Sequence, residues 1–199
     1  MKLNNGVEIP QIGFGTWTLE DHDVCVKAVK DALNIGYTHI DTASIYKNEA
    51  FVGEAIKDYD RSKLFITTNL WNDVRGYDET IKAFNDSLDA LGLDYLDMYL
   101  IHWPNPVKYR ENYIEKNIET WRAMEDLYKA RKVRAIGVCS FWVHHLEELM
   151  EKTEIKPAVN QMEYHPNFFQ DDIVDFCKKN DIAIEAWSPL GKGRLIKKK

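Results

Sequence analysis

Residues 64–72 read LFITTNLWN, an apolar run that reaches a single amide at Asn69. Two further runs, HIDTASIY at 39–46 and YLIHWP at 99–104, also end in polar, titratable groups. Short apolar runs rich in β-branched and aromatic residues are typical of buried strands. Such a run occurs seven times along the chain, as IGFGTW, THIDTA, LFITTN, YLDMYLIHW, VRAIGVCSF, PAVNQMEYH and IAIEAWSPL. The stretch around Asn69 is therefore one unit in a repeating series of strands.

Helical patterns fill most of the intervals between these strands. Residues 25–35, 81–91 and 118–128 carry apolar side chains at helical spacing, and a glycine directly follows each of the first two ranges. Strands that alternate with helices predict a parallel sheet with helical cover. Upstream of the series, KLNNGVEIP at 2–10 predicts a small β-hairpin with Asn5 and Gly6 at its turn.

Two architectures fit this alternation, an open doubly wound sheet and a (β/α)₈ barrel of the TIM type. The open sheet would usually carry a glycine-rich phosphate turn after its first strand, but GFGTW at 13–17 is not such a turn. In a barrel, functional residues gather where the strands end. The polar and aromatic residues at these ends are Asp41, Tyr46, Asn69, His102, Gln161 and Trp187. The sequence therefore favours an α/β barrel.

The number of strands falls short of a full barrel. A complete barrel takes about 250 residues, whereas this chain has 199 residues and seven strand-like runs. We therefore expect one incomplete barrel domain over residues 1–199 that lacks the last βα unit. Its two unpaired strand edges could pair with another chain, so self-association is expected.

The overall composition is that of a globular protein, with 45% apolar and 29% charged residues. A net charge of −6 argues against nonspecific nucleic-acid binding. No apolar run approaches the roughly 20 residues that span a bilayer, and the N-terminus shows no signal segment, so we expect a cytoplasmic protein. The three cysteines fit no disulfide framework. His144 and His145 are expected at the surface, and no metal site is expected.

Seven stretches of the chain together form a longer pattern. They are GFGTW (13–17), DTASIYKNE (41–49), LFITTNLWN (64–72), YLIHWP (99–104), HHLEEL (144–149), VNQMEYHP (159–166) and AWSPLG (186–191). This pattern resembles the aldo-keto reductase family, in the family's order and spacing from residue 3 to about residue 195. The resemblance implies a barrel that binds NADPH across its rim and reduces aldehydes or ketones to alcohols. Hydride would pass from the nicotinamide to the carbonyl carbon while a tyrosine protonates the oxygen.

The resemblance assigns catalytic roles and reveals one departure. Tyr46 matches the proton donor, His102 matches the group that orients the carbonyl, and Asp41 matches an aspartate paired with a lysine. The lysine position is occupied by Asn69. A cation ~4 Å away at an effective dielectric constant of ~20 is worth up to about 4 kcal/mol. Without it we expect the pKa of Tyr46 to stay at about 10, the pKa of Asp41 to rise, and the chemistry to be impaired.

The resemblance also implies a cofactor site. Gln161 would hold the carboxamide together with Cys139 and Ser140, where the family usually has Ser-Asn, and Trp187 would stack on the nicotinamide. Lys192, Arg194 and the terminal lysines could meet a phosphate, although a solvated tail is the alternative. The full set expected to contact NADP(H) is Gly15, Thr16, Trp17, Asp41, Ser140, Gln161, Trp187, Ser188 and Leu190.

Aromatic residues follow several strands and could wall a carbonyl pocket or simply pack beneath the loops. The candidates are Trp17, Trp71 and Trp103, with Phe141 and Trp142 beside them. Three interpretations of the whole chain remain. It could be an impaired NADPH-dependent carbonyl reductase, a non-catalytic scaffold, or a fragment of a longer protein. The intact set of Asp41, Tyr46, His102 and Gln161 favours the enzyme, whereas Asn69, Cys139, Ser140 and the expected lack of an eighth βα unit favour the scaffold.

Overall fold

The computed structural model describes residues 1–193, with the side chain of Lys192 excepted. Its centre is a parallel sheet of seven strands whose order in space equals their order in the chain. All seven strands expected from the sequence are present. They are β1 (Phe14–Gly15), β2 (His39–Asp41), β3 (Phe65–Leu70), β4 (Leu96–Ile101), β5 (Val133–Cys139), β6 (Val159–Glu163) and β7 (Ala183–Trp187).

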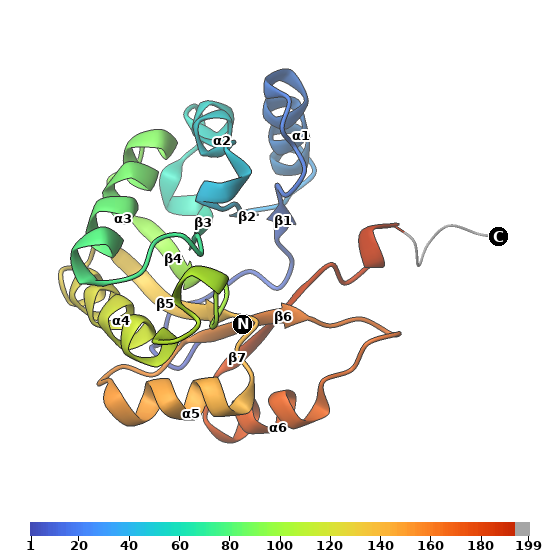
Figure 1. The fold of residues 1–199 in the computed structure, drawn as a ribbon. Coiled ribbons are helices and arrows are strands. Elements are labelled where there is room, and N and C mark those ends of the chain that lie inside the picture. The colour runs from blue at the N-terminus through green and yellow to red at the C-terminus, as the bar shows by residue number, and fades with distance from the viewer. Residues whose placement is uncertain (194–199) are drawn as a thin grey trace.

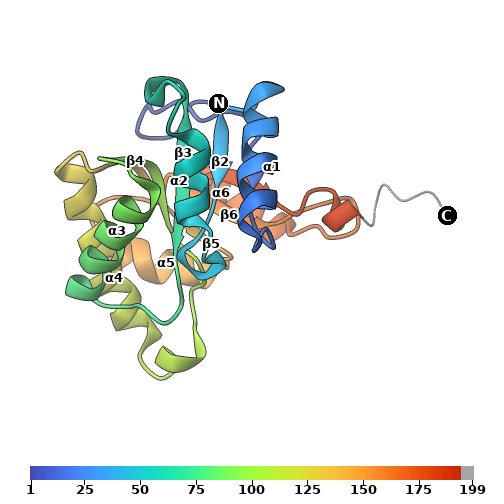
Figure 2. The same ribbon diagram turned by 90° about the horizontal axis from the view of Figure 1, so that it is seen from above.

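Six α-helices and three short 3₁₀-helices lie between the described strands, and a fourth 3₁₀-helix follows β7. The sheet curls, and the helices lie around its outside (Figure 1). In the view turned by 90°, α1 runs beside α2, and α3 lies beside α4 (Figure 2). The helices are α1 (His22–Asn34), α2 (Glu49–Ile56), α3 (Tyr77–Leu91), α4 (Tyr113–Lys129), α5 (Val143–Lys152), α6 (Asp171–Lys179), η1 (Ser44–Tyr46), η2 (Arg61–Lys63), η3 (Val107–Tyr109) and η4 (Gly191–Gly193).

The sheet is an incomplete barrel within the described residues. Each strand pairs only with its chain neighbours, so β1 and β7 are the two edges of the sheet. The strands differ in burial: β3 and β4 are buried along their whole length, whereas every residue of β7 is partly exposed. The expected barrel with one βα unit too few is therefore confirmed for residues 1–193.

The ends of the first and third α-helices follow from local chemistry. Asp21 begins α1 by accepting a hydrogen bond from the backbone N–H of Val24 at 3.0 Å, as N-cap residues do. Gly92 ends α3 in the left-handed conformation, with φ of 65°, which costs a glycine little. Gly36, with φ of 104°, follows α1. Both glycines are the stops expected from the sequence.

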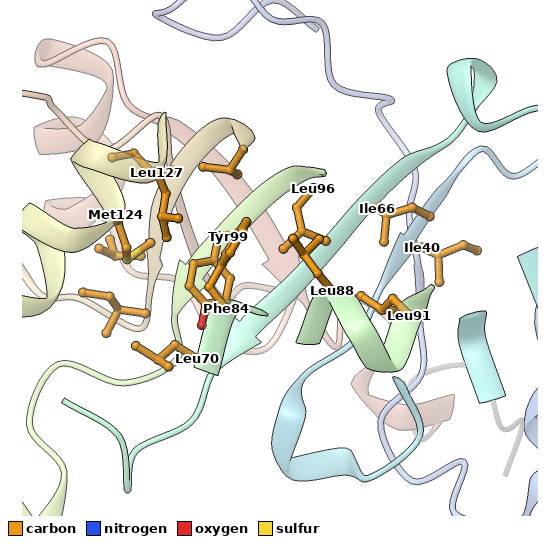
Figure 3. Packing of buried hydrophobic residues seen from close by; sticks show 14 of the residues in the cluster. Ile40, Ile66, Leu70, Phe84, Leu88, Leu91, Leu96, Tyr99, Met124 and Leu127 are labelled. Atoms are coloured by element: carbon orange, nitrogen blue, oxygen red, sulfur yellow. The ribbon is translucent and has the colours of Figure 1, made fainter. Parts of the chain in front are cut away.

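The larger apolar core lies between the outer face of the sheet and the helices (Figure 3). In α3, Phe84, Leu88 and Leu91 face the strands, and Phe84 meets Tyr99 of β4 edge-to-face at 5.2 Å. This is the apolar helix face expected over residues 81–91. Trp121 of α4 is also fully buried, and its indole N–H donates to the carbonyl of Ile155 at 2.8 Å.

A second, smaller core fills the inside of the curled sheet near the N-terminal ends of the strands. The predicted hairpin closes this end as one antiparallel bridge between Lys2 and Glu8, and it brings Leu3 and Ile9 into the small core. Two side chains tie the hairpin down. The amide of Asn4 donates to the carbonyl of Pro157, and that of Asn5 donates to the carbonyl of Arg134, each at 2.9 Å.

One buried carboxylate belongs to the fold rather than to the rim. Asp97 of β4 is fully buried and accepts a hydrogen bond from the backbone N–H of Ile66 at 2.8 Å. Its two oxygens form ion pairs with Arg61 at 2.7 Å and Arg134 at 2.6 Å. A buried carboxylate with this many donors is fully compensated.

Two histidines at the start of α5 differ in burial. His144 is exposed as expected, but His145 is buried, because its ring packs edge-on against Tyr113 and near Phe141. Its Nδ1 accepts a hydrogen bond from the backbone N–H of Trp142 at 3.1 Å. Placing His145 at the surface was therefore wrong.

Within residues 1–193, no helix has the length and apolar character needed to cross a membrane.

Candidate functional site

The carboxyl ends of the strands surround one large hollow of about 1330 Å³, called here the rim cavity. It extends between β1 and β7, the two edges of the sheet. Asn69, Ser140 and Leu190 were expected at the site but are not part of its lining. The expected residues that do line it are Gly15, Thr16, Trp17, Asp41, Tyr46, Trp71, His102, Trp103, Gln161, Trp187 and Ser188.

Tyr46 and His102 face each other on the cavity wall. Their ring centroids are 5.9 Å apart and the rings are nearly perpendicular, at 84°. Trp71 meets the same histidine edge-on at 5.1 Å. The Nδ1 atom of His102 is buried and has no hydrogen-bond partner among the described residues. Two polar groups of complementary chemistry therefore share an apolar, aromatic corner.

Burial sets the protonation of both groups. It lowers the pKa of His102 to about 4, with the charge of Arg75 adding to the effect, so the imidazole is neutral at pH 7. It raises the pKa of Tyr46 well above the ordinary value, and the nearby Asp41 adds to that rise. The expectation of a tyrosine pKa near 10 was therefore too low, because it left out desolvation. Tyr46 holds its proton at neutral pH.

Asn69 lies behind the cavity wall and is 1% exposed. Its amide nitrogen donates to the backbone carbonyl of Thr42 at 2.9 Å, and its Oδ1 has no partner among the described residues. The side chain also donates toward the Asp41 carboxyl group. Asn69 thus supplies a hydrogen bond at the position where the resemblance implies a cation, but no charge.

Asp41 is consequently a partly buried carboxyl group without a cationic partner among the described side chains. Burial raises its pKa, and hydrogen bonds from Gln161 and Asn69 offset only part of the rise. The expected increase in the pKa of Asp41 is confirmed. The Gln161 amide donates to Asp41 at 2.9 Å and also to Glu185 at 3.2 Å, so it bridges two carboxyl groups.

Glu185 and His39 belong to this site and were not predicted from the sequence. Burial and the neighbouring Asp41 raise the pKa of Glu185. Burial lowers the pKa of His39 to about 4, and its Nε2 lies 2.9 Å from the hydroxyl of Thr67. Strand periodicity could have found both residues. His39 precedes Asp41 by two positions and Glu185 precedes Trp187 by two, which places each pair on one face of its strand.

Asn48 is a further residue that the motifs did not single out. It is fully buried, and its amide donates to the carbonyls of Thr16 and Leu19 at 2.9 and 3.1 Å. Its Oδ1 accepts from the Thr42 hydroxyl at 2.8 Å. The Thr16 hydroxyl is itself buried and donates to the backbone carbonyl of Asp41 at 3.2 Å. Asn48 therefore fixes the segment after β1 to the segment after β2.

Cys139 and Ser140, which were expected to hold the carboxamide, both contact Gln161, but of the two only Cys139 lines the cavity. The Cys139 thiol lines the cavity and donates to Gln161 Oε1 at 3.7 Å. Burial raises the pKa of this thiol to about 12, so it is protonated. Ser140 sits in the left-handed region with φ of 60°, and its backbone N–H donates to the Gln161 carbonyl at 2.7 Å. The pair holds Gln161 in place from the β5 side.

Three of the five candidate aromatic residues line the cavity. Trp17, Trp71 and Trp103 do so, whereas Phe141 is buried in the larger core and Trp142 is exposed. The buried Arg75 donates to the carbonyls of Trp71 and Trp103 at 2.9 and 2.7 Å. It also contacts the Asn117 Oδ1 at 3.3 Å. One guanidinium thus joins the two tryptophan-bearing loops.

The far side of the cavity is only partly described. Ser188, with φ of 50°, lines it, and Leu190 is exposed outside the lining. The Lys192 side chain, Arg194 and the terminal lysines, which were expected to meet a phosphate, lie outside the described residues.

The sequence profile of the aldo/keto reductase family matches residues 11–199. The chain belongs to this family. It is 51% identical over 198 residues to the glyoxal reductase of Bacillus subtilis strain 168, covering 98% of this chain and 69% of that protein.

Solved aldo-keto reductases share the fold as well. The crystal structure of an aldo/keto reductase from Brucella melitensis superposes with a TM-score of 0.90 at 48% identity, covering 96% of this chain and 73% of that one. An aldo-keto reductase of Bombyx mori, solved in complex with NADP, superposes with a TM-score of 0.86 at 37% identity. The match covers 95% of this chain and 66% of the Bombyx mori protein.

Proposed function

We propose that this aldo-keto reductase reduces small aldehydes and ketones to alcohols with NADPH, at a rate limited by the neutral residue at position 69. The observation that best supports the proposal is the pairing of Tyr46 and His102, 5.9 Å apart on the wall of the rim cavity. The glyoxal reductase relative and the relative solved with NADP support the choice of substrate and cofactor. Glyoxal is the first substrate to test.

The residues of the cavity fit a nicotinamide cofactor. Trp187 offers an aromatic face, Gln161 offers an amide, and a hollow of about 1330 Å³ accommodates a large ligand. The Gln161 amide already donates to two carboxyl groups, so it must share or exchange these bonds to hold a carboxamide. NADPH, when bound, supplies the hydride.

The chain itself supplies positioning and a proton. His102 is neutral, so it can donate a hydrogen bond to a carbonyl oxygen without bringing a charge. Tyr46 carries the proton that the reduced oxygen must receive. The three tryptophans give this corner apolar walls, and a low-dielectric surrounding strengthens both interactions.

The slow rate of reduction that we expect also follows from the surroundings of Tyr46. A lysine beside Tyr46 would favour the tyrosinate and make the hydroxyl a stronger acid. Asn69 adds no charge, and the raised pKa of Tyr46 makes it a weaker proton donor. Hydride transfer depends mainly on positioning, so the reaction is slowed rather than abolished.

The test is a titration with NADPH, followed by the quenching of tryptophan fluorescence, and then NADPH oxidation in the presence of glyoxal. Tyr46→Phe should keep cofactor binding and lower the rate of turnover by about 10²- to 10⁴-fold, the usual contribution of a general acid. Tyr59→Phe is the matched control, because its hydroxyl contacts only the exposed Asn34 at 3.1 Å. Turnover unchanged in Tyr46→Phe would contradict the assignment.

A non-catalytic binding protein is the second candidate, and the neutral Asn69 beside an unpaired Asp41 favours it. The same experiment separates the two candidates. Saturable NADPH binding without turnover of any tested aldehyde would support the binding protein. Failure to bind NADPH at millimolar concentration would contradict both.

A further inference from the structure

Inside the sheet lie two partly buried carboxyl groups, Asp41 and Glu185, with no cationic partner among the described side chains. Gln161 bridges Asp41 and Glu185 with one amide nitrogen, at 2.9 and 3.2 Å. Neither carboxyl group forms an ion pair with any described side chain. By contrast, the buried Asp97 contacts two arginines. Buried carboxylates are normally paired with a cation or bound to a metal.

A histidine, His39, joins the two carboxyl groups as a third candidate metal ligand. One ring nitrogen of His39, one oxygen of Asp41 and one oxygen of Glu185 lie within 4.8 Å of one another. Metal–ligand bonds of about 2.0–2.2 Å need neighbouring ligand atoms roughly 3–4 Å apart. A bound ion would therefore have to draw these three atoms closer together. Imidazole together with carboxylates is a donor set that suits first-row divalent ions.

Two further observations suit the binding of an ion at this place. The Glu185 Oε2 is buried and has no hydrogen-bond partner among the described residues, although Oε1 of the same group is satisfied by Gln161. Asp41, Gln161 and Glu185 also line the rim cavity, so an ion has a route to them, while His39 is 1% exposed behind them. Gln161 could keep donating to the carboxylates as a support around the ion.

We propose that His39, Asp41 and Glu185 bind one divalent transition-metal ion, such as Zn²⁺, next to the position that Asn69 leaves uncharged. The ion would supply the positive charge that this part of the sheet lacks. The proposal concerns binding and does not depend on carbonyl reduction. A chain that turns over no aldehyde could still bind the ion, and a chain that binds no metal could still be a reductase.

The test is a calorimetric titration of the metal-free 199-residue chain with Zn²⁺, repeated with Mg²⁺. We expect one Zn²⁺ per chain and much weaker binding of Mg²⁺, which prefers oxygen ligands in an octahedral arrangement. Glu185→Gln keeps the size of the side chain and should weaken Zn²⁺ binding at least tenfold. His39→Gln should weaken it by a similar factor.

A matched control lies on the surface. His22 contacts two carboxylates, Asp23 at 2.8 Å and Glu54 at 2.9 Å, but it is exposed. His22→Gln should leave Zn²⁺ binding unchanged. Loss of binding in His22→Gln, with binding retained in Glu185→Gln, would overturn the proposal in favour of a surface site.

Asn69→Lys gives the sharpest test of the charge argument. An ammonium group beside Asp41 repels a divalent ion, so Zn²⁺ binding should weaken at least tenfold in this variant. The spectrum of the Co²⁺-substituted chain identifies the ligands. Visible bands without a sulfur-to-cobalt charge-transfer band fit His39, Asp41 and Glu185, whereas a strong charge-transfer band would place the ion on Cys139 and overturn the assignment.

The remaining outcomes also decide the question. No saturable Zn²⁺ binding by the parent chain, or equal binding in Glu185→Gln, overturns the proposal. If thermal unfolding shows that His39→Gln does not fold, Glu185→Gln and Asn69→Lys carry the test, since neither removes a hydrogen bond that joins two strands through His39.

Discussion

Asp97 is a fully buried carboxylate on the sheet and Asp41 is a partly buried one, and the main difference between them is in their partners. Asp97 contacts two arginines and a backbone N–H. Asp41 contacts only uncharged donors among the described side chains, from Gln161 and Asn69. The first carboxylate is compensated and stabilises the N-terminal side of β3 to β5. The second has no cationic partner among the described side chains, so the free-energy cost of its desolvation is not offset by an ion pair. Buried charge that is left unpaired is a mark of a functional site rather than of the fold.

Removing the compensated charge should have the largest effect on stability. Asp97→Asn leaves Arg61 and Arg134 without their partner and should lower the free energy of unfolding by about 3 kcal/mol, the lower end for a broken buried pair, since both arginines are partly exposed. Urea denaturation measures the change. Asp41→Asn is the counterpart and should cost less than half as much. Equal losses in the two variants would remove the distinction between the two carboxylates.

Adding a charge at the rim should have the next largest effect, on rate. Asn69→Lys should raise the rate of glyoxal reduction about 10- to 100-fold, which corresponds to about 1.4–2.7 kcal/mol in the barrier. The pKa in the pH profile of alcohol oxidation should fall, because the cation favours the tyrosinate form of Tyr46.

Asn69→Met is the neutral control for that variant, because it adds length without charge. A rate increase of the same size in both variants would mean that packing, and not charge, limits Tyr46. A chain that binds NADPH but gains no rate from Asn69→Lys would contradict the electrostatic account.

Loosening the two tryptophan loops should have a smaller effect. The guanidinium of Arg75 contacts the carbonyls of Trp71, Val74 and Trp103, and Arg75→Lys replaces it with a single ammonium group. We expect a loss of about 1–2 kcal/mol in unfolding free energy and a raised KM with a smaller change in kcat. Arg110→Lys, at an exposed position, is the control. An unchanged KM for glyoxal would show that the two loops keep their conformation without the Arg75 guanidinium.

The pH dependence of stability should show the smallest effect. Burial raises the folded-state pKa of Glu185 above its unfolded value, so the native state binds the proton more tightly, and this group's contribution falls as pH rises from the unfolded value through the folded one. From pH 5 to pH 8, the free energy of unfolding of Glu185→Gln should therefore rise by about 1–2 kcal/mol relative to that of the parent chain.

Denaturation curves at the two pH values measure this difference, with the exposed Glu115→Gln as control. Metal must be removed with a chelator, because a bound ion would mask the effect. A difference of the opposite sign would show that Glu185 is ionised and compensated in the native state.

The fold was predictable because its signals are local. The strand runs and the stop glycines Gly36 and Gly92 depend only on neighbouring residues, and both glycines end helices as expected. The rim residues followed from knowing where each strand ends. What the sequence could not supply was contact across the sheet. Gln161 meets Asp41 from 120 residues away, and that contact depends on how far the sheet curls.

The missed properties have the same origin. The pKa of Tyr46 depends on burial by several loops, and the burial of His145 depends on Tyr113 from another helix. Glu185 was overlooked because a lone acidic residue in a strand is an unremarkable local pattern. Its chemistry arises only when β2 and β7 face each other across the inside of the sheet.

The sequential order of the strands has a consequence for how the chain folds. Paired strand residues are separated by 22 positions, between Val138 and Asn160, to 37, between Leu96 and Val133. Each strand can therefore dock on the preceding one as the polypeptide leaves the ribosome, without waiting for a distant partner. The hairpin is different, since Asn4 contacts Pro157 across 153 residues. The N-terminal hairpin is made first, but Asn5 can bind Arg134 only after the fifth strand is made, and Asn4 can bind Pro157 only later still.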